Sequence, residues 1–376
     1  MMTSPTRLIV LVLLLSMGGM GCQDNANPST PTTPDTGTPM DDPSRAGAVG
    51  FGVSGLLFNN NLVMYDRSRS DLRASKLVLI PQIYFTTIDA PDFPVYGTFP
   101  KDQLASGGPK IDDIPALTNP SFVTASGVDY LADDDLVIGL VLNGETRAYP
   151  HNVLWWHEIV NDQVGGQRVS VTFCPLTGTG LVFDITTPRD HLEMIPATEV
   201  TWRLWKQLHP ETLVIARSNS NRLLTQYPYG SYQFENTPPL FPLNRSLDTR
   251  FPPKRMIHGI LTSGLVKAYP FSSLGTRAAV NDAIVGRDVL VVFDQAGRLA
   301  LSYDRRVNGQ SLTFRVVDGG VPFRLQDQET GTVWTVEGKA IDGPLNGKTL
   351  TRISTAYNAF WFAWAAFWPT TAVYAL

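Results

Sequence analysis

An internal repeat constrains the fold of this chain more than any other feature of its sequence. Residues 139–184 align without a gap on residues 259–304 at a constant offset of 120, and 15 of these 46 positions are identical. Most identities are glycines, prolines and apolar positions, which determine turns and core packing. The sequence therefore predicts one structural unit that occurs twice.

The two copies differ in reactive chemistry. His157, Glu158 and Cys174 of the first copy are replaced by Arg277, Ala278 and Asp294 in the second. A duplicated fold that holds an imidazole, a carboxyl and a thiol in only one copy indicates one working half and one supporting half. An ion pair between Arg277 and Asp294 is the expected replacement, because a substituted pair of opposite charge indicates that the two positions are neighbours.

The pattern within each copy predicts mainly β structure of the α+β class. In the first copy, residues 136–142 and 145–149 flank Asn143-Gly144 and read as a hairpin, residues 151–160 read as a short helix, and 168–173 and 181–184 read as strands. In the second copy, residues 311–317, 323–327 and 332–336 are further strand candidates. Two Trp pairs, at 202 and 205 and at 361 and 364, predict a short aromatic-rich helix that closes each repeat.

The spacing of these features indicates a displaced segment. The Trp pairs align at an offset of 159, so the first copy is shorter than the second by 159 − 120 = 39 residues. Residues 51–73 resemble residues 314–334, with Met64-Tyr65-Asp66 over Leu325-Gln326-Asp327. We therefore expect residues 49–80 to supply the strands that the first copy lacks, paired beside residues 169–173 or 181–184.

The N-terminus reads as an export signal followed by a lipid anchor. Arg7, the apolar run 8–15 and small residues before Cys22 are typical of a signal peptide, and Gly19-Met20-Gly21-Cys22 resembles a bacterial lipobox. This predicts a lipoprotein of the outer membrane or cell surface, attached to the membrane through Cys22, or a periplasmic protein if Cys22 is not lipidated. The predicted segments are residues 1–21 (signal peptide), 22–48 (disordered tether), 49–80 (displaced strands), 100–217 (first repeat) and 250–376 (second repeat).

The composition bears on which classes of molecule the protein could bind. The net charge is −4 and the chain has no basic run, which argues against nucleic-acid binding. If Cys22 carries lipid, Cys174 is the remaining thiol of the chain, since the sequence has 2 cysteines.

Several further motifs are specific in sequence: GGPKIDDIP at 107–115, RAYP at 147–150, WHEIVND at 156–162, CPLTGT at 174–179, FGVSG at 51–55 and MYDR at 64–67. With these motifs the chain resembles a family of exported bacterial and archaeal proteins known as domain of unknown function 3179. Family members place the FGVSG stretch after the CPLTGT stretch, so the order in this chain is permuted. The resemblance implies a shared site but no established reaction.

Three interpretations of that site remain open. His157, Cys174 and Glu158 are ligand types that suit zinc or copper. Alternatively, His157 and Cys174 form a nucleophilic pair of catalytic residues. In the third interpretation the protein is a non-catalytic module that binds a small molecule or an envelope polymer in a cleft near Trp155, and the histidine and thiol are structural.

The first two interpretations require His157 and Cys174 to converge. Folding of the hairpin and helix onto the strand 168–173 is expected to bring them together. The supporting residues expected around them are Asp162, Asn161, Tyr149, Thr177 and Asp112.

Overall fold

The computed structural model describes residues 8–12, 62–66, 78–79, 114–186, 192–240, 243, 246–262 and 265–375, the first three ranges by their backbone only. The fold is mainly β, as the sequence predicts, and its sheets are arranged as a five-bladed β-propeller. Among the described helices, none is long and apolar enough to span a membrane.

The first half of the described chain contains two sheets and two short helices. Its core elements are β6 (Leu136–Leu142), β7 (Glu145–Pro150), α3 (His151–His157), β8 (Ile159–Val164), β9 (Gln167–Cys174), β10 (Thr179–Asp184), β11 (Glu193–Met194), β12 (Thr198–Thr201), α4 (Trp202–Leu208) and β13 (Leu213–Ile215). Two short strands precede them, β4 (Leu117–Thr118) and β5 (Phe122–Thr124), with a 3-10 turn η3 (Ala125–Gly127). Two more 3-10 turns follow, η4 (Arg217–Asn219) and η5 (Gly230–Gln233).

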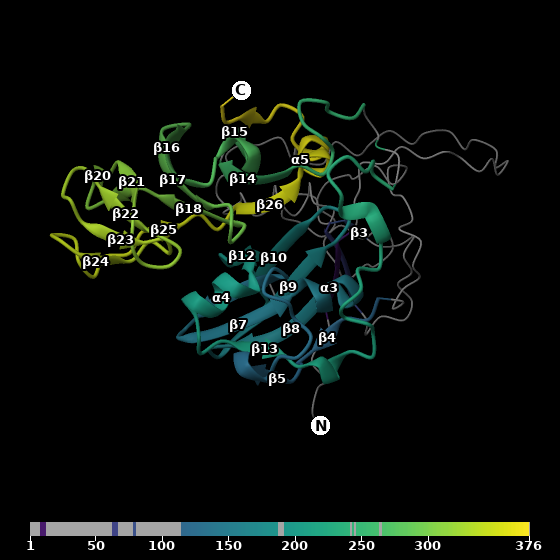
Figure 1. Cartoon of the computed structure of the whole chain (residues 1–376). Coiled ribbons are helices and arrows are strands. Elements are labelled where there is room, and N and C mark those ends of the chain that lie inside the picture. The colour runs from purple at the N-terminus through teal and green to yellow at the C-terminus, as the bar shows by residue number, and fades with distance from the viewer. Residues whose placement is uncertain are drawn as a thin grey trace, which may run out of the picture.

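The second half contains the corresponding core strands and closing helix, with the 3-10 turn η6 in place of α3 and with an insertion. It comprises β14 (Met256–Thr262), β15 (Leu265–Pro270), η6 (Phe271–Ser273), β16 (Arg277–Ile284), β17 (Arg287–Asp294), β18 (Leu299–Asp304), β25 (Thr351–Arg352), β26 (Ala356–Phe360), α5 (Trp361–Phe367) and β27 (Ala372–Val373). The insertion after β18 forms β19 (Arg306–Val307), β20 (Gln310–Ser311), β21 (Phe314–Val317), β22 (Arg324–Asp327), β23 (Val333–Thr335) and β24 (Ala340–Asp342). These inserted strands lie at one end of the molecule (Figure 1).

Apart from the edge strands β4 and β5 of the first half, the strand orders of the two halves correspond. The order β12-β6-β7-β13 in the first half matches β26-β14-β15-β27 in the second, and β11-β10-β9-β8 matches β25-β18-β17-β16. The registers correspond as well, since Gly139 lies opposite Thr198 and Ala148, and Gly259 opposite Tyr357 and Ala268.

Each closing helix is held by a tryptophan that packs on a strand glycine. A Cβ atom at Gly139 would overlap the Trp205 ring, and one at Gly259 would overlap the Trp364 ring. Both indoles are fully buried, and each Nε1–H donates to a threonine hydroxyl at 3.0 Å, Thr212 in α4's half and Thr371 in α5's half. The glycines recur in the sequence because only a residue without a side chain admits the ring.

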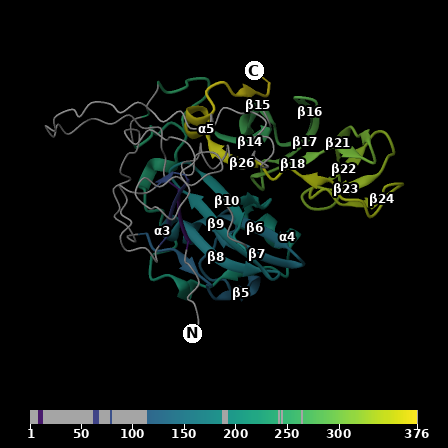
Figure 2. The ribbon, with the colours of Figure 1, turned by 180° about the vertical axis from the view of Figure 1, so that it is seen from behind.

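The cores lie both within and between the halves. Each half buries apolar side chains between its own two sheets. Two further clusters join the halves: α5 and β26 pack against β10, and α4 packs against β18 and the inserted strands. Figure 2 shows α5 and β26 beside β10. The halves are therefore joined by apolar surfaces of a kind that a single domain buries.

The first helix of the repeat is shorter than the sequence predicts. The predicted helix over 151–160 ends at His157, and residues from Ile159 onward form β8, a strand that the helical pattern concealed. Helix α3 ends because Glu158 adopts a left-handed conformation with φ of 52°. The Gly165-Gly166 pair, whose φ angles are 53° and 80°, then forms the turn between β8 and β9.

The segment expected to complete the first repeat forms its own small sheet. Strands β1 (Leu8–Val12), β2 (Leu62–Asp66) and β3 (Val78–Leu79) pair in the order β1-β2-β3. The expected pairing of β2 beside β9 or β10 is not present; β1, which falls in the predicted signal peptide, makes the contacts with β8 and β9 instead. Residue Cys22, the tether 22–48, Asp112 and the motifs at 51–55 and 107–113 lie outside the described residues.

The glycine-to-indole contact predicts a sharp effect of one methyl group. We expect Gly139→Ala to lower the free energy of unfolding by about 3 kcal/mol, because overpacking of a tight core forces the indole to move. The melting temperature should fall by roughly 4 °C for a chain of this size. Calorimetry of both proteins measures the change.

The matched control for this change is Gly127→Ala. Its added Cβ would meet Val123 at an ordinary 3.5 Å, so its melting temperature should stay close to that of the wild type. Equal effects of the two substitutions would contradict the role of the indole contact.

Candidate functional site

Glu158 has the most unusual conformation among the residues that only the first half carries. Its backbone lies in the left-handed region, which non-glycine residues rarely adopt, and its N–H closes α3 by donating to Leu154 O at 2.8 Å. In the second half the equivalent Ala278 is an ordinary strand residue paired with Phe293. Backbone strain of this kind is concentrated at functional sites.

The Glu158 carboxyl is buried, and no described residue forms a hydrogen bond with it; only 6% of the residue is exposed. Burial raises its pKa from 4.5 to about 8. The carboxyl is therefore mostly protonated at neutral pH and offers a hydrogen-bond donor.

Cys174 lies next to this carboxyl at the end of β9. Burial and the neighbouring Glu158 raise the pKa of the thiol to about 12, although Thr177 and Leu176 lower it in part by hydrogen bonding. Thr177 N–H donates to Cys174 O at 3.2 Å and its hydroxyl donates to the same oxygen at 3.3 Å. The thiol is therefore protonated and poorly nucleophilic at neutral pH.

The ring nitrogens of His157 form hydrogen bonds with residues other than Cys174. Its Nδ1 bonds to Pro115 O at 2.8 Å and its Nε2 to Ser220 Oγ at 2.9 Å, so neither ring nitrogen bonds to Cys174. Burial lowers the pKa of this imidazole. The structure therefore shows no hydrogen bond between His157 and Cys174. Their convergence in a metal or nucleophilic site stays a prediction.

In the second half, which lacks the left-handed turn, the positions equivalent to His157 and Cys174 lie on two paired strands. Arg277 and Asp294 are directly opposite each other in β16 and β17, with Arg277 Nε 3.7 Å from the Asp294 carboxylate. This confirms the ion pair expected from the sequence. In the first half the pairing of β8 with β9 starts only at Ile159, because α3 extends through His157.

The metal interpretation stays a prediction. Within the described ranges, no three His, Cys, Asp or Glu side chains gather closely enough to hold a metal ion. Cys174 and Glu158 are neighbours, but His157 bonds elsewhere, and Asp112 is not among the described residues.

Tyr149 and Asp162, two of the supporting residues expected around the site, form a pair that has an equivalent in the second half. Tyr149 donates its hydroxyl proton to Asp162 at 2.8 Å, and Tyr269 donates to Asp282 at 2.7 Å in the second half. Because the pair recurs where the site does not, it braces the repeat. His151 is similar: its ring packs on Phe173 as the Phe271 ring packs on Phe293.

Three tyrosines that the sequence pattern did not predict lie near Cys174. Tyr227, Tyr229 and Tyr232 belong to the irregular segment between the halves. Burial raises the pKa of each, and the nearby Cys174 thiol raises it further. Tyr232 donates to Leu176 O at 3.0 Å. The sequence signal was three tyrosines within six residues (YPYGSY) outside any periodic pattern.

These tyrosines extend into an aromatic corner formed by Trp155, Tyr227 and Tyr229. The Trp155 and Tyr227 rings are perpendicular, with centroids 5.1 Å apart, and Tyr229 lies 5.6 Å from Tyr227. All three rings are only partly buried. The Tyr227 hydroxyl oxygen is buried and has no hydrogen-bond partner in the part of the chain that the structure describes, which is an unusual state for a buried polar atom.

The second half forms a hydrogen bond with the turn that follows Cys174. Phe360 N–H, at the start of α5, donates to Thr177 O at 2.8 Å. The reciprocal bond joins Thr201 N–H, at the start of α4, to Gly297 O at 2.9 Å. The supporting half thus positions the turn of the working half directly.

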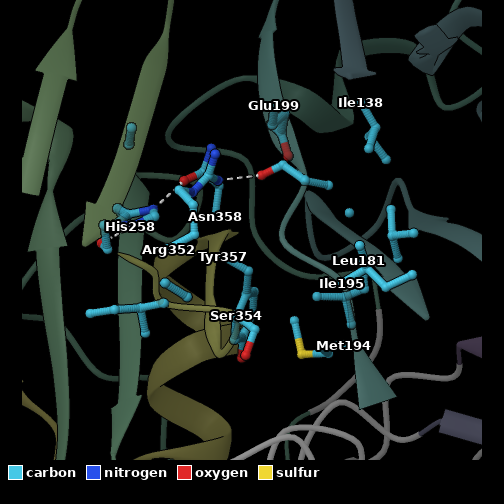
Figure 3. A pocket seen from close by; sticks show the side chains of 17 residues that line it. Ile138, Leu181, Met194, Ile195, Glu199, His258, Arg352, Ser354, Tyr357 and Asn358 are labelled. Carbon is cyan, nitrogen blue, oxygen red and sulfur yellow. Dashed lines mark hydrogen bonds between the residues drawn. The ribbon is translucent and has the colours of Figure 1, made fainter. Parts of the chain in front are cut away.

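A second polar centre lies between the two halves (Figure 3). It is a cavity of about 30 Å³, with Ile138, Leu181, Met194 and Ile195 on one wall and Glu199, Asn358 and His258 on the other. Its volume suits one or two water molecules rather than a larger ligand.

A chain of hydrogen bonds crosses this cavity wall. The Asn358 amide donates to Glu199, His258 Nδ1 bonds to Asn358 Oδ1 at 2.8 Å, and His258 Nε2 bonds to Ser302 Oγ at 2.6 Å. Burial lowers the pKa of His258 to about 4, so the ring is neutral and accepts the serine proton. Glu199 Oε2 is buried without a partner, and burial raises the pKa of this carboxyl from 4.5 to about 7.

The raised pKa of Glu199 predicts a pH-dependent stability. The carboxyl takes up its proton more readily in the folded chain, so this stabilisation is fully present below pH 4.5 and is lost as pH rises through 7. We expect wild type to lose on the order of 2–3 kcal/mol relative to Glu199→Gln over this range. Urea unfolding of both proteins at pH 4.5, 6 and 8 measures the difference.

Glu199→Gln is a close structural match, since a glutamine oxygen still accepts from Asn358. Parallel pH profiles of the two proteins would contradict the assignment of the titration to Glu199.

Comparison with known proteins places the chain in a family. The family model described as "Protein of unknown function (DUF3179)" matches residues 111–191 and 186–371, which is more than half of the 376-residue chain. Comparison with curated proteins gave no match, and comparison with solved structures gave none either. The matched residues include both halves and the turn that carries Cys174, so the chain belongs to the family of proteins of unknown function DUF3179.

Proposed function

We propose that this protein is an exported, non-catalytic binding module that holds a saccharide of the cell envelope in the aromatic corner of its first half. The observation that carries the proposal is the Tyr227 hydroxyl, which is buried without a hydrogen-bond partner among the described residues. It lies between partly exposed aromatic rings, and one of these, Tyr229, is near the buried Glu158 carboxyl. Polar groups left unpaired in a folded chain are explained when a ligand pairs with them.

The state of the reactive groups favours binding over catalysis. The Cys174 thiol has a pKa of about 12, and the one imidazole expected to activate it has both nitrogens engaged by Pro115 and Ser220. A nucleophilic cysteine requires a lowered pKa or an adjacent base. Neither is provided by the described residues.

The chemistry of the corner favours a polyhydroxyl ligand. The C–H faces of a sugar ring pack on aromatic faces, and its hydroxyls pair with donors and acceptors at the ring edges. The corner offers perpendicular aromatic walls, the Tyr227 hydroxyl and a carboxyl that is mostly uncharged at neutral pH. An uncharged site avoids the penalty of burying an unpaired charge against a neutral ligand.

The second half is proposed to be a duplicated copy that has lost the site and kept the scaffold. The matching strand orders and the reciprocal bonds at Thr177 and Gly297 support this interpretation. Attachment to the membrane through Cys22 is proposed from the lipobox, and the share of protein in the membrane fraction, compared with Cys22→Ser, measures it.

The first experiment separates binding from metal and thiol chemistry. We expect protein purified without chelators to contain no stoichiometric zinc or copper, and Cys174 to react with a maleimide at least 100-fold more slowly in the folded protein than in urea, because burial keeps it protonated. Elemental analysis and mass spectrometry give the two readouts. One equivalent of bound metal, or a fast-reacting thiol in the folded protein, would sink the binding proposal.

The second experiment tests the ligand class. Tryptophan fluorescence and calorimetry should detect binding of soluble peptidoglycan fragments or lipopolysaccharide core sugars. Tyr227→Phe should weaken it roughly 5- to 30-fold, which corresponds to about 1–2 kcal/mol for one lost hydrogen bond. Trp155→Ala should abolish it by removing one wall of the corner.

The matched control is Tyr374→Phe in the second half, where Tyr374 stacks on Tyr269 at 5.4 Å and no such corner exists. It should leave the affinity unchanged. An equal loss in both tyrosine variants, or binding of peptides in place of sugars, would contradict the saccharide assignment.

A further inference from the structure

Residues 227–238 form a segment without strands, here named the tyrosine strap because it carries the three tyrosines near Cys174. It contains the 3-10 turn η5 and otherwise irregular chain. Its backbone hydrogen bonds are mostly local, such as Phe234 N–H to Ser231 O at 3.0 Å. A segment with few backbone bonds to the rest of a fold opens at a low cost in free energy.

Lys254 holds the end of this strap. Its Nζ donates to Thr237 O at 3.0 Å and to Pro238 O at 3.2 Å, and its backbone N–H donates to Glu235 O at 3.0 Å. The Nζ atom also lies 3.5 Å from the centroid of the Tyr232 ring. One residue of the second half therefore contacts four residues of the strap.

The Lys254 ammonium is buried in an aromatic cage. Only 3% of the residue is exposed, and Nζ lies 4.9 Å and 5.8 Å from the ring centroids of Phe362 and Phe360. Within the described ranges it has no ion-pair partner, since Glu235 pairs with Arg255. Burial lowers its pKa to about 8, so the group is still mostly charged at pH 7. The two carbonyls and the cage offset the cost of removing this charge from water.

The first half shows that the repeat itself does not require a buried lysine here. At the offset of 120, Lys254 aligns with Asp134, which is exposed and pairs with Arg203. At the offset of 159, the cage residue Phe362 aligns with Arg203. The backbone of this loop nevertheless bonds to the closing helix in the same way in both halves. The lysine and its cage therefore belong to the contact with the strap.

The strap covers the groups that distinguish the first half. Tyr232 donates to Leu176 O, on the turn that follows Cys174, at 3.0 Å, and Tyr229 lies near the Glu158 carboxyl. Both the thiol and this carboxyl are buried. A ligand can bond to the Glu158 carboxyl only after the residues that cover it move, and the strap is the irregular part of that cover.

We propose that the tyrosine strap is a lid over Glu158 and Cys174, and that Lys254 is the positioning residue that holds this lid closed. Release of the lysine contact lets a ligand in the aromatic corner reach the Glu158 carboxyl. This inference deepens the proposed function and rests on it for the identity of the ligand. Opening of the lid is measured through the thiol, without a ligand.

Maleimide labelling of Cys174 at pH 7 tests the role of the lysine. Lys254→Ala should label at least about 30-fold faster than the wild type, which corresponds to about 2 kcal/mol, because charge-assisted hydrogen bonds and a cation–π contact are lost. Added n-propylammonium replaces the missing side chain and should restore slow labelling. The neutral analogue 1-propanol should not, which separates the effect of the charge from that of lost packing.

The matched control is Lys267→Ala in the second half. Lys267 Nζ lies 5.7 Å from the centroid of the Tyr269 ring, a comparable contact that does not involve the strap. This variant should label at the wild-type rate. Unchanged labelling of Lys254→Ala, equal labelling of the two lysine variants, or equal rescue by both additives overturns the proposal.

Urea distinguishes opening of the lid from unfolding of the whole chain. Local opening exposes little surface, so labelling of Lys254→Ala should be nearly constant at low urea concentrations, whereas labelling through global unfolding rises steeply. Amides of residues 229–238 should exchange at least about 10-fold faster in this variant, with those of β9 unchanged. A steep urea dependence, or equally faster exchange in β9, overturns the lid. Absence of saccharide binding by the wild type would contradict the proposed function and leave these thiol results standing, so the two proposals fail separately.

Discussion

The structure depends on a reciprocal contact between its halves. The first N–H of each closing helix donates to a turn of the other half, from Thr201 to Gly297 and from Phe360 to Thr177. The indoles of Trp205 and Trp364 fix those helices on strand glycines of their own half. Each closing helix therefore packs on its own half and forms a hydrogen bond with a turn of the other half. The apolar faces of both closing helices are thus removed from water.

This arrangement explains how a half without reactive groups supports a half that has them. The turn after Cys174 is bound on one side by α5 of the second half and on the other by Tyr232. It excludes water from the thiol and from Glu158, and burial then keeps both protonated. The partly exposed rings of the aromatic corner lie at the edge of this dry region.

The fold has a second consequence at the plane where the halves meet. Ile138 and Val182 of the first half correspond to His258 and Ser302 of the second, so one cavity wall is apolar and the other carries a hydrogen-bond chain. The unpaired oxygen of Glu199 at one end of this chain makes the interface sensitive to protonation. The two buried carboxyls, Glu158 and Glu199, thus lie in different environments of one repeated scaffold.

Local sequence determined the elements whose signals are short-range. The Asn143-Gly144 hairpin, the strand glycines under the tryptophans, the Trp-bearing helices and the Arg277–Asp294 pair all follow from residue type and from the offset between copies. The strand β8 did not, because Ile159 and Val160 continue the apolar spacing of α3 and only the left-handed turn at Glu158 separates them.

The candidate site depended on contacts between residues distant in sequence. His157 could bond to Cys174 or to Pro115 and Ser220, and the choice was decided by the direction in which α3 leaves β7 and by where the later chain returns. The tyrosines at 227–232 reach the thiol only because that chain folds back over β9. Sequence pattern specifies which side chains are buried, but the partner of a buried polar group is set by tertiary packing, because donors and acceptors far apart in the chain compete for it.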